Sequence, residues 1–447
     1  MITWQDFEKA PNKLKFISQS IATYMRSEAY KLAVDADEYE AQRNVTINNT
    51  VRMVYDITGL GVPDPMSSNN KIACNFFHRL NTDRCQYSLG NGVTFPESDI
   101  KEQLGDTFDT ELARAAYYAL IHGVAYFFPN GDKYHVFPMT QFLPLPDEET
   151  GALRGGIRFW SLEWRKRPIQ AVLFEEDGYT KYATEPGKYG LGALQETEPK
   201  RAYKQTVRVS EADGEEIIDQ SNYGILPIVP VYACKAKQSS LVGMRAKIDA
   251  YDMIQSGFAN DLQDCAQIYW LIGNAQGMMD DDIAKLRDRL IYQHMAVVDT
   301  TNSNITPYTQ EVPYSSRQVA LASLRSALYE DFGVLDVHTV AAGATNDHIQ
   351  AAYQTMDVEA DDFEYQIIQA VQQILKLKGM EPLVPQFKRN RVANQLEMVQ
   401  MVMQEANYLD DETVLNHLPN ITVDEVQGIL ERKAAESVNR FEISAGE

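Results

Sequence analysis

Residues for several common chemistries are scarce in this chain of 447 amino acids. It has four cysteines, and none belongs to a CxxC pair or has histidines near it at the spacing of zinc ligands. We therefore expect reduced thiols and a reducing compartment. No run of 18 apolar residues occurs, and the N-terminus lacks the basic and apolar stretches of a signal peptide. We expect no membrane segment.

The short motifs that mark many enzymes are also missing. There is no GxxxxGK[ST] loop for phosphates, no GxSxG nucleophile motif and no HExxH zinc motif. Of the seven histidines, His338 and His348 are near each other in sequence. They could form a metal-binding pair, or they could be two polar residues beside a loop. The sequence therefore predicts no catalytic residues, no metal and no cofactor, and hence no enzyme.

A cluster of acidic residues leaves a similar choice. Five of them lie within residues 357–364, and Asp357 and Asp361 share one helix face because they are four residues apart. They could form a carboxylate metal site, but no further ligand is evident, which favours a solvated helix face.

Basic residues are outnumbered: 41 lysines and arginines stand against 63 acidic residues, for a net charge of −22. A composition of 44% hydrophobic and 23% charged residues is ordinary for a globular protein of two to four domains. A protein that binds many phosphates should be basic where it binds them, so the acidic balance argues against a simple DNA coat. An acidic surface would repel the DNA backbone, which still allows a protein that surrounds DNA without gripping it.

The apolar periodicity divides the chain into helical and β-rich parts. It predicts helices within residues 1–60, from Lys71 to Leu89 and from Asp106 to His122. Between Val124 and Pro230, short aromatic and β-branched runs separated by turn residues predict an antiparallel meander. It ends in the apolar strand GILPIVPVYA at residues 224–233.

Three long helices are expected after this region. Apolar residues from Leu241 to Trp270 recur about every 3.5 positions, which predicts one straight helix capped by Ser239 or Ser240. A second helix begins near Ser315 or Ser316, and a third covers residues 346–378. A small helix at 280–290 and strands at 295–300 and 305–312 lie between the first two.

Four sequence phrases, in this order, resemble a known family. They are NNKIACNFFHRLNTDRCQYSLGNGV (69–93), GILPIVPVYA (224–233), LVGMRAKIDAYDMIQSGFANDLQD (241–264) and AAGATNDHIQAAYQTMDVEADDFEYQIIQAVQQIL (341–375). The chain is similar to the portal proteins of tailed bacteriophages, in particular of siphophages with Gram-positive hosts. The β region and the C-terminal tail are shorter than the family pattern.

The resemblance implies an α+β portal fold, mainly helical, with long stem helices, an antiparallel β region in the wing and a small α/β clip. The implied regions are the wing (1–237), stem helix 1 (238–268), the clip (269–313), stem helix 2 (314–335), the tunnel loop (336–348), the long wing helix with its connector (349–389) and the crown (390–447).

The resemblance also implies a function and partners. About twelve copies would form a ring at one capsid vertex, through which the terminase packages double-stranded DNA and from which the DNA is later ejected. The implied partners are the terminase large subunit, head-completion or adaptor proteins, and the major capsid and scaffold proteins. The protein would be assembled in the host cytoplasm, reside in the virion and contact DNA without reading its sequence.

Three sets of residues are candidates for contacts in such a ring. The tunnel loop would face the DNA with Thr339, Val340, Ala341, Ala342, Gly343, Ala344, Thr345 and Asn346. A basic set near the first long helix could meet DNA or scaffold, or form surface salt bridges: Lys235, Lys237, Arg245 and Lys247. The clip would meet terminase or connector through Asp280, Asp281, Asp282, Lys285, Arg287 and Arg289.

Two other classes of function remain open at this point. The chain could be a helical scaffold unrelated to portals, or an enzyme such as a nuclease or hydrolase that uses the acidic residues 357–364. A ring of about a dozen copies would separate the portal from both, since a metal-dependent hydrolase is expected as a monomer.

Overall fold

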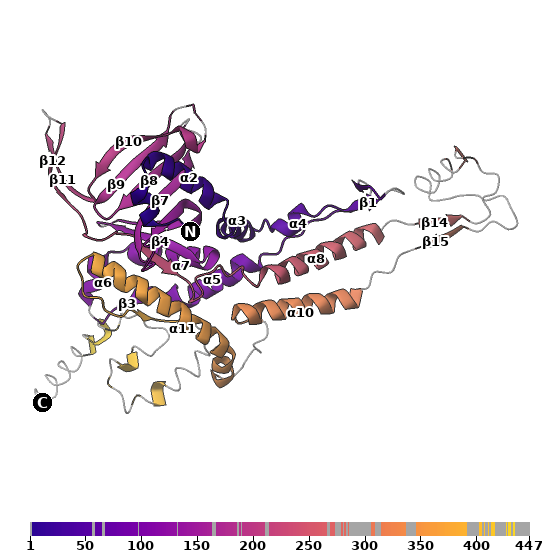
Figure 1. Ribbon diagram of the computed structural model, residues 1–447. Coiled ribbons are helices and arrows are strands. Elements are labelled where there is room, and N and C mark those ends of the chain that lie inside the picture. The colour runs from indigo at the N-terminus through magenta and orange to yellow at the C-terminus, as the bar shows by residue number, and fades with distance from the viewer. Residues whose placement is uncertain are drawn as a thin grey trace, which may run out of the picture. The chain divides into compact units, whose positions relative to one another are not determined.

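A computed structural model gives the fold of this chain (Figure 1). The structure describes residues 2–55, 59–64, 68–96, 98–131, 133–162, 167–185, 187–188, 190–210, 214–265, 269–272, 305–308, 314–336 and 346–390, with scattered positions in 279–285 and 402–433. Two compact units are formed, each from separate stretches of the sequence. The first contains residues 1–40, 76–244 and 329–447, and the second contains residues 41–75 and 245–328.

The first unit combines helices with antiparallel sheets. Its helices are α1 (Trp4–Lys9), α2 (Lys13–Met25), α3 (Glu28–Glu40), α5 (Phe76–Leu89), α6 (Ser98–Leu104), α7 (Phe108–His122) and α11 (Asn346–Leu377). Its strands are β3 (Val93–Thr94), β4 (Val124–Asn130), β5 (Lys133–Pro138), β6 (Phe142–Pro146), β7 (Leu153–Leu162), β8 (Arg167–Glu175), β9 (Gly178–Thr184), β10 (Leu194–Arg201), β11 (Lys204–Ser210), β12 (Gly214–Ser221), β13 (Val229–Tyr232) and β16 (Gln386–Phe387).

One core of this unit lies around the three-stranded sheet β13-β4-β5. The helices α7 and α11 contact this sheet, and their buried residues include Leu112, Phe363 and Ile367. Helix α7 ends at Gly123, whose φ of +92° is left-handed; a Cβ there would lie 2.8 Å from the backbone of Gln238. Glycine is therefore required at this turn by both its backbone angle and its neighbour.

A second core lies on a five-stranded meander with the order β10-β9-β8-β7-β6. Because side chains alternate along a strand, the two faces of this sheet differ. Ile157 and Leu173 pack with Phe7, Ile17 and other residues of the N-terminal helices, so α2 covers that face (Figure 1). The opposite face carries an aromatic cluster shared with β4 and β5, which includes Phe128, Phe137 and Phe174.

The second unit is built around two long helices. Its elements are α4 (Val45–Asn49), β1 (Met53–Tyr55), β2 (Gly61–Pro63), α8 (Arg245–Cys265), β14 (Tyr269–Ile272), β15 (Ile305–Tyr308) and α10 (Tyr314–Phe332). The last residues of α10, from Tyr329, belong to the first unit. The ring centroids of Phe258 and Tyr314 are 5.6 Å apart, and Arg317 forms an ion pair with Asp261. Helices α8 and α10 thus lie side by side (Figure 1).

The prediction of a mixed α+β chain with antiparallel strands is confirmed. Two details were wrong. The helix expected from Lys71 begins at Phe76, and the helix expected over Leu241–Trp270 covers Arg245–Cys265, with Trp270 in strand β14. Strand β15 pairs with β14, and residues 295–300, the partner expected for it, lie outside the described residues.

The expected capping serines have another role. Ser239 and Ser240 donate hydrogen bonds to the backbone carbonyls of Ile121 and Leu120, at the end of α7. The last carbonyls of a helix have no partner within it, so these hydroxyls satisfy the end of α7 rather than the start of α8.

Candidate functional site

The buried face of α8 is mostly polar. Its residues below 9% exposure are Ile248, Asp252, Ser256 and Asn260, which are spaced four apart and share one side of the helix. The apolar stripe of the sequence lies elsewhere: Tyr251, Ile254 and Phe258 are half-buried, and Leu262 is 53% exposed.

The polar face binds an extended segment of the same unit, residues 70–74, which we call the strap. The backbone N–H of Cys74 donates to Asp252 (2.8 Å), that of Ile72 to the Ser256 hydroxyl (3.0 Å) and that of Asn70 to the Asn260 side chain (2.6 Å). Every second strap residue is thus held by every fourth residue of α8. These are backbone donors that would otherwise lack a partner.

The pairing follows from the dimensions of the two elements. Two residues of extended chain span about 6.6 Å, and four residues of helix rise about 6 Å. The two repeats nearly match, so an extended segment can run along a helix and meet a side chain once per turn. The strap runs antiparallel to α8 because its residue numbers rise as those of α8 fall.

Asp252 binds two different segments of the second unit. One carboxylate oxygen accepts from the Cys74 backbone, and the other accepts from the side-chain amide of Asn44 at 2.5 Å. Burial raises the pKa of Asp252, although both hydrogen bonds oppose that shift and the nearby Asp249 adds to it. The carboxylate joins the strap and the segment before α4 to one position of the helix.

Helices α8 and α10 carry exposed apolar side chains. Met253 and Leu262 on α8 are 44% and 53% exposed, and Tyr314 and Val319 on α10 are 57% and 69% exposed. Single exposed apolar residues are normal on a protein surface, but four on one pair of adjacent helices favour contact with another protein surface.

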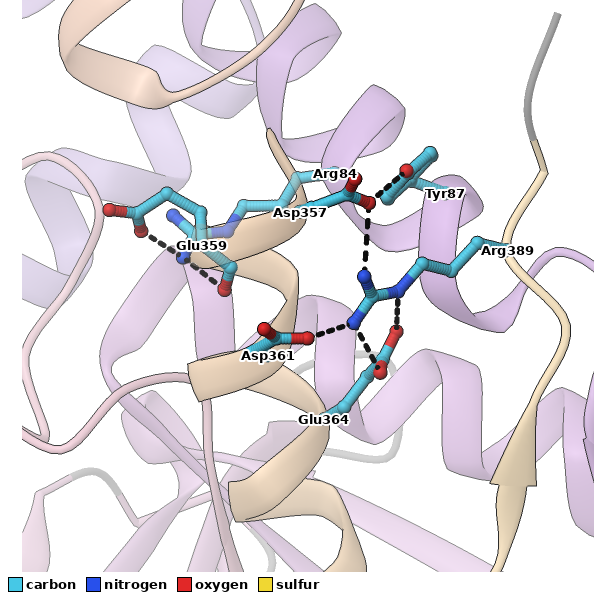
Figure 2. A network of polar contacts seen from close by, with 7 residues as sticks. All are labelled: Arg84, Tyr87, Asp357, Glu359, Asp361, Glu364 and Arg389. Atoms are coloured by element: carbon cyan, nitrogen blue, oxygen red, sulfur yellow. Dashed lines mark hydrogen bonds and ion pairs between the residues drawn. The ribbon is translucent and has the colours of Figure 1, made fainter. Parts of the chain in front are cut away.

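A second polar cluster lies in the first unit, on α11 (Figure 2). Arg389 forms two bonds of 2.9 Å to the two oxygens of Glu364, a 3.0 Å bond to Asp357 and an ion pair with Asp361. The three acids lie on one side of α11. The hydrogen bonds that Arg389 donates to Glu364 raise its pKa, burial opposes that shift, and the hydrogen bond to Asp361 adds to it. This arginine neutralises part of the negative charge of the acidic residues 357–364, for which the sequence allowed either a solvated helix face or a metal site.

Neighbouring residues extend this cluster to α5. The hydroxyl of Tyr87 donates to Asp357 (2.6 Å), and Arg84 pairs with Glu359 (2.7 Å) (Figure 2). The backbone N–H of Asn390 donates to the carbonyl of Tyr87 (2.8 Å). Residues 389–390, where the chain leaves β16, are therefore fixed to both α5 and α11.

The structure describes only some of the predicted site residues. Of the tunnel loop, Asn346 is the first residue of α11, and the remaining positions, 339–345, lie outside the described residues. In the clip, Asp281, Asp282 and Lys285 are helical and exposed, whereas positions 280, 287 and 289 lie outside the described residues.

Three of the basic residues, Lys235, Lys237 and Arg245, lie beside identified partners. The Lys235 ammonium is 3.7 Å from Asp362, and the Lys237 ammonium is 4.4 Å from the ring centroid of Tyr232. Arg245 lies 3.8 Å from Asp249, one helical turn away on α8. Lys235 and Lys237 belong to the first unit, and Arg245 and Lys247 to the second.

Other expectations concern metals, thiols and membranes. Among the residues that the structure describes, no group of three or more histidine, cysteine or acidic side chains is arranged to hold a metal ion. Cys74, Cys85 and Cys234 form no disulfide, and burial raises the pKa of Cys85 to about 12. No helix of the described parts is both long and apolar enough to cross a bilayer.

Sequence reasoning missed the strap and Arg389. Asp252, Ser256 and Asn260 at four-residue spacing were a usable signal, but polar residues on one side of an amphipathic helix usually face solvent. The partners of Arg389 lie 25 to 32 residues before it, and nothing local in the sequence indicates that pairing.

Comparison with known proteins agrees with the order of elements. The model of the family described as "Phage portal protein, SPP1 Gp6-like" matches residues 26–438. A curated relative, the portal protein of Clostridium phage phiCD119, is 24% identical over 224 residues, which are 48% of this chain and 49% of the relative. This chain thus spans about half the length of the curated relative it matches.

Solved structures of gene transfer agent (GTA) particles were also matched. A chain in the neck of the native particle, computed with C12 symmetry, aligns with a TM-score of 0.42 at 12% identity, covering 78% of this chain and 90% of that one. A chain of the native virion aligns with a TM-score of 0.43 at 10% identity, with the same coverage. A chain in the neck of the empty particle, computed with C6 symmetry, gives 0.44 at 10%, covering 78% and 91%.

Proposed function

This chain belongs to the SPP1 Gp6-like phage portal protein family, and from that premise we propose that it forms a ring of about twelve copies at one capsid vertex. The ring is a channel for double-stranded DNA, which enters during packaging and leaves at ejection. The family match over residues 26–438 carries this proposal. A closed ring arises when one heterologous contact is repeated by rotation.

The partners follow from this role. The terminase large subunit docks at the clip, residues 269–313, and head-completion or adaptor proteins replace it later. The major capsid and scaffold proteins surround the wing, and the ring is assembled in the host cytoplasm before it becomes part of the virion. The chain itself performs no catalysis, so the energy for packaging comes from the terminase motor.

Helices α8 and α10 are the proposed stem. Their exposed residues Met253, Leu262, Tyr314 and Val319 support this assignment, because a neighbouring copy would cover them in a ring. The net charge of −22 supports a channel through which DNA slides, since like charges repel.

Leu262→Asp should prevent ring formation while leaving the single chain folded. Leu262 is 53% exposed, so a carboxylate there is hydrated in the monomer and loses its water only at the interface. We expect a shift from rings to monomers in native mass spectrometry of the purified protein. The control is Ala246→Asp, which adds the same charge at an exposed position in the first turn of α8, where acids are favourable. Normal rings from Leu262→Asp would contradict the stem assignment.

The tunnel loop can be tested by packaging. Replacing Ala342 and Gly343 by tryptophan should leave ring assembly intact and reduce the DNA packaged per capsid, because bulky side chains would narrow the channel where small residues stand. Procapsids, motor and DNA would be assayed for nuclease-protected DNA. A wild-type yield from rings with both substitutions would show that these residues do not face the DNA.

A further inference from the structure

A small aromatic cleft in the first unit has no assigned role. Its volume is about 280 Å³, and it lies between the three-stranded sheet and the aromatic face of the five-stranded sheet. Its lining includes Phe137 and His135 of β5, Arg158 and Trp160 of β7, and Lys181 of β9. We call it the Arg158 cleft.

Arg158 lies beside two aromatic rings and has no polar partner among the described residues. Its guanidinium carbon lies 4.3 Å from the ring centroid of Phe137 and 4.5 Å from that of Trp160. The structure gives it no hydrogen-bond acceptor and no ion pair among the described residues, and its Nε is shielded from solvent. An arginine stays protonated in proteins, so this cleft contains an uncompensated positive charge.

The other ionisable groups of the cleft do not cancel this charge. Lys181 is paired with Glu198 at 3.1 Å. Burial, together with the nearby charge of Arg158, lowers the pKa of His135, which keeps that ring neutral at pH 7; Glu111 opposes the shift. Burial also lowers the pKa of Arg158, as expected for a cation without a carboxylate beside it.

Size and chemistry define what fits. Sites for drug-sized molecules and cofactors usually measure about 300–1,000 Å³, so this cleft lies at the lower limit of that range and has room for one side chain. A carboxylate is the natural partner of a planar guanidinium, to which it can accept two parallel hydrogen bonds. Arginines and aromatic residues in desolvated pockets are also the residues that contribute most to binding between proteins.

We propose that the Arg158 cleft receives a carboxylate side chain from the neighbouring copy of this chain in the ring. This rests on the ring proposed above. The neighbour is the occupant we infer because the chain has 22 more acidic than basic residues, so its surface offers mainly carboxylates. A contact repeated by rotation gives each copy one such neighbour, and hence one occupant for every cleft.

Salt titration of purified rings tests the charge. Arg158→Gln should dissociate the rings at lower NaCl concentration than the wild type, with about a tenfold larger dissociation constant, the expected loss for one charged pair. Arg158→Lys, which keeps the charge without the planar fork, should lie between them. The control is Arg154→Gln on the same strand, since Arg154 is already paired with Glu176 at 2.8 Å and is exposed. It should match the wild type.

Photo-crosslinking tests the occupant with Arg158 in place. A p-benzoylphenylalanine at Trp160 should join adjacent copies, and mass spectrometry should find the partner peptide to be acidic. The same group at the exposed Lys188 serves as the control. No crosslink, equal yields at both positions, or crosslinks only to other head proteins would overturn the proposal. If the wild-type protein forms no rings, the proposed function is wrong. If the wild type forms rings and the Arg158→Gln rings resist salt equally well, only the proposal for the Arg158 cleft is wrong.

Discussion

Arg389→Ala is expected to destabilise the first unit by about 3 kcal/mol, which is the usual cost of removing one partner of a largely buried ion pair. Arg389 is 19% exposed, and its acceptors Asp357 and Glu364 are 24% and 12% exposed. Without the guanidinium, these two carboxylates and Asp361 would repel one another along one side of α11. The midpoint of urea unfolding, measured by far-UV circular dichroism on the dissociated chain, should fall accordingly.

Two further variants make this test specific. Arg389→Lys keeps the charge but cannot bind both oxygens of Glu364 in the same way, so it should recover only part of the loss. Arg79→Ala breaks an exposed pair with Asp83, at 3.9 Å on α5, and should change stability by less than about 0.5 kcal/mol. If Arg389→Ala costs no more than Arg79→Ala, the cluster has no stabilising role.

Asp252→Ala should detach the strap from α8. The change leaves the Cys74 backbone N–H and the Asn44 amide without their acceptor in a buried place, and each unsatisfied donor costs about 1–3 kcal/mol. We expect a loss of about 3 kcal/mol in unfolding free energy. Hydrogen exchange at the amides of Ile72 and Cys74 should accelerate at the same time. Gln255→Ala on the same helix, a half-buried position, is the control, and equal effects of both changes would refute the assignment.

The pH dependence of Asp252 has a definite sign. Burial raises its pKa above the ordinary value of 3.8, so the folded chain binds this proton more tightly than the unfolded chain does. The contribution of Asp252 to stability therefore increases as the pH falls through the raised pKa towards 3.8. Compared with Asp252→Asn, the wild type should gain stability as the pH decreases over that window. A growing advantage towards high pH would show that the carboxylate is not desolvated.

Local signals in the sequence located the ends of several helices correctly. Gly123, Gly333 and Gly379 follow α7, α10 and α11 with φ of +92°, +64° and +77°, and glycine there was a sufficient signal. The meander was also predicted, because aromatic and β-branched runs alternate with turns. Strand β10 was missed, since its sequence LQETEPKR is charged and contains a proline.

Contacts between distant segments were not predictable in this way. Residues 71–75 look helical in composition, yet they are extended because α8 supplies side-chain acceptors for their amides. Polarity alone does not distinguish water from a strap as the partner of Asp252, Ser256 and Asn260. The same holds for the acidic residues of α11, whose cation Arg389 comes from beyond the end of that helix.

The attachment of the strap to α8 also has a mechanical consequence. Its hydrogen bonds at Asn70, Ile72 and Cys74 lie one behind another along the helix. A force that slides the strap along the axis loads all of them together, whereas a force that lifts one end of the strap breaks them in succession. The second unit should therefore resist shear along α8 far better than peeling away from it, and its strength depends on the direction of the load.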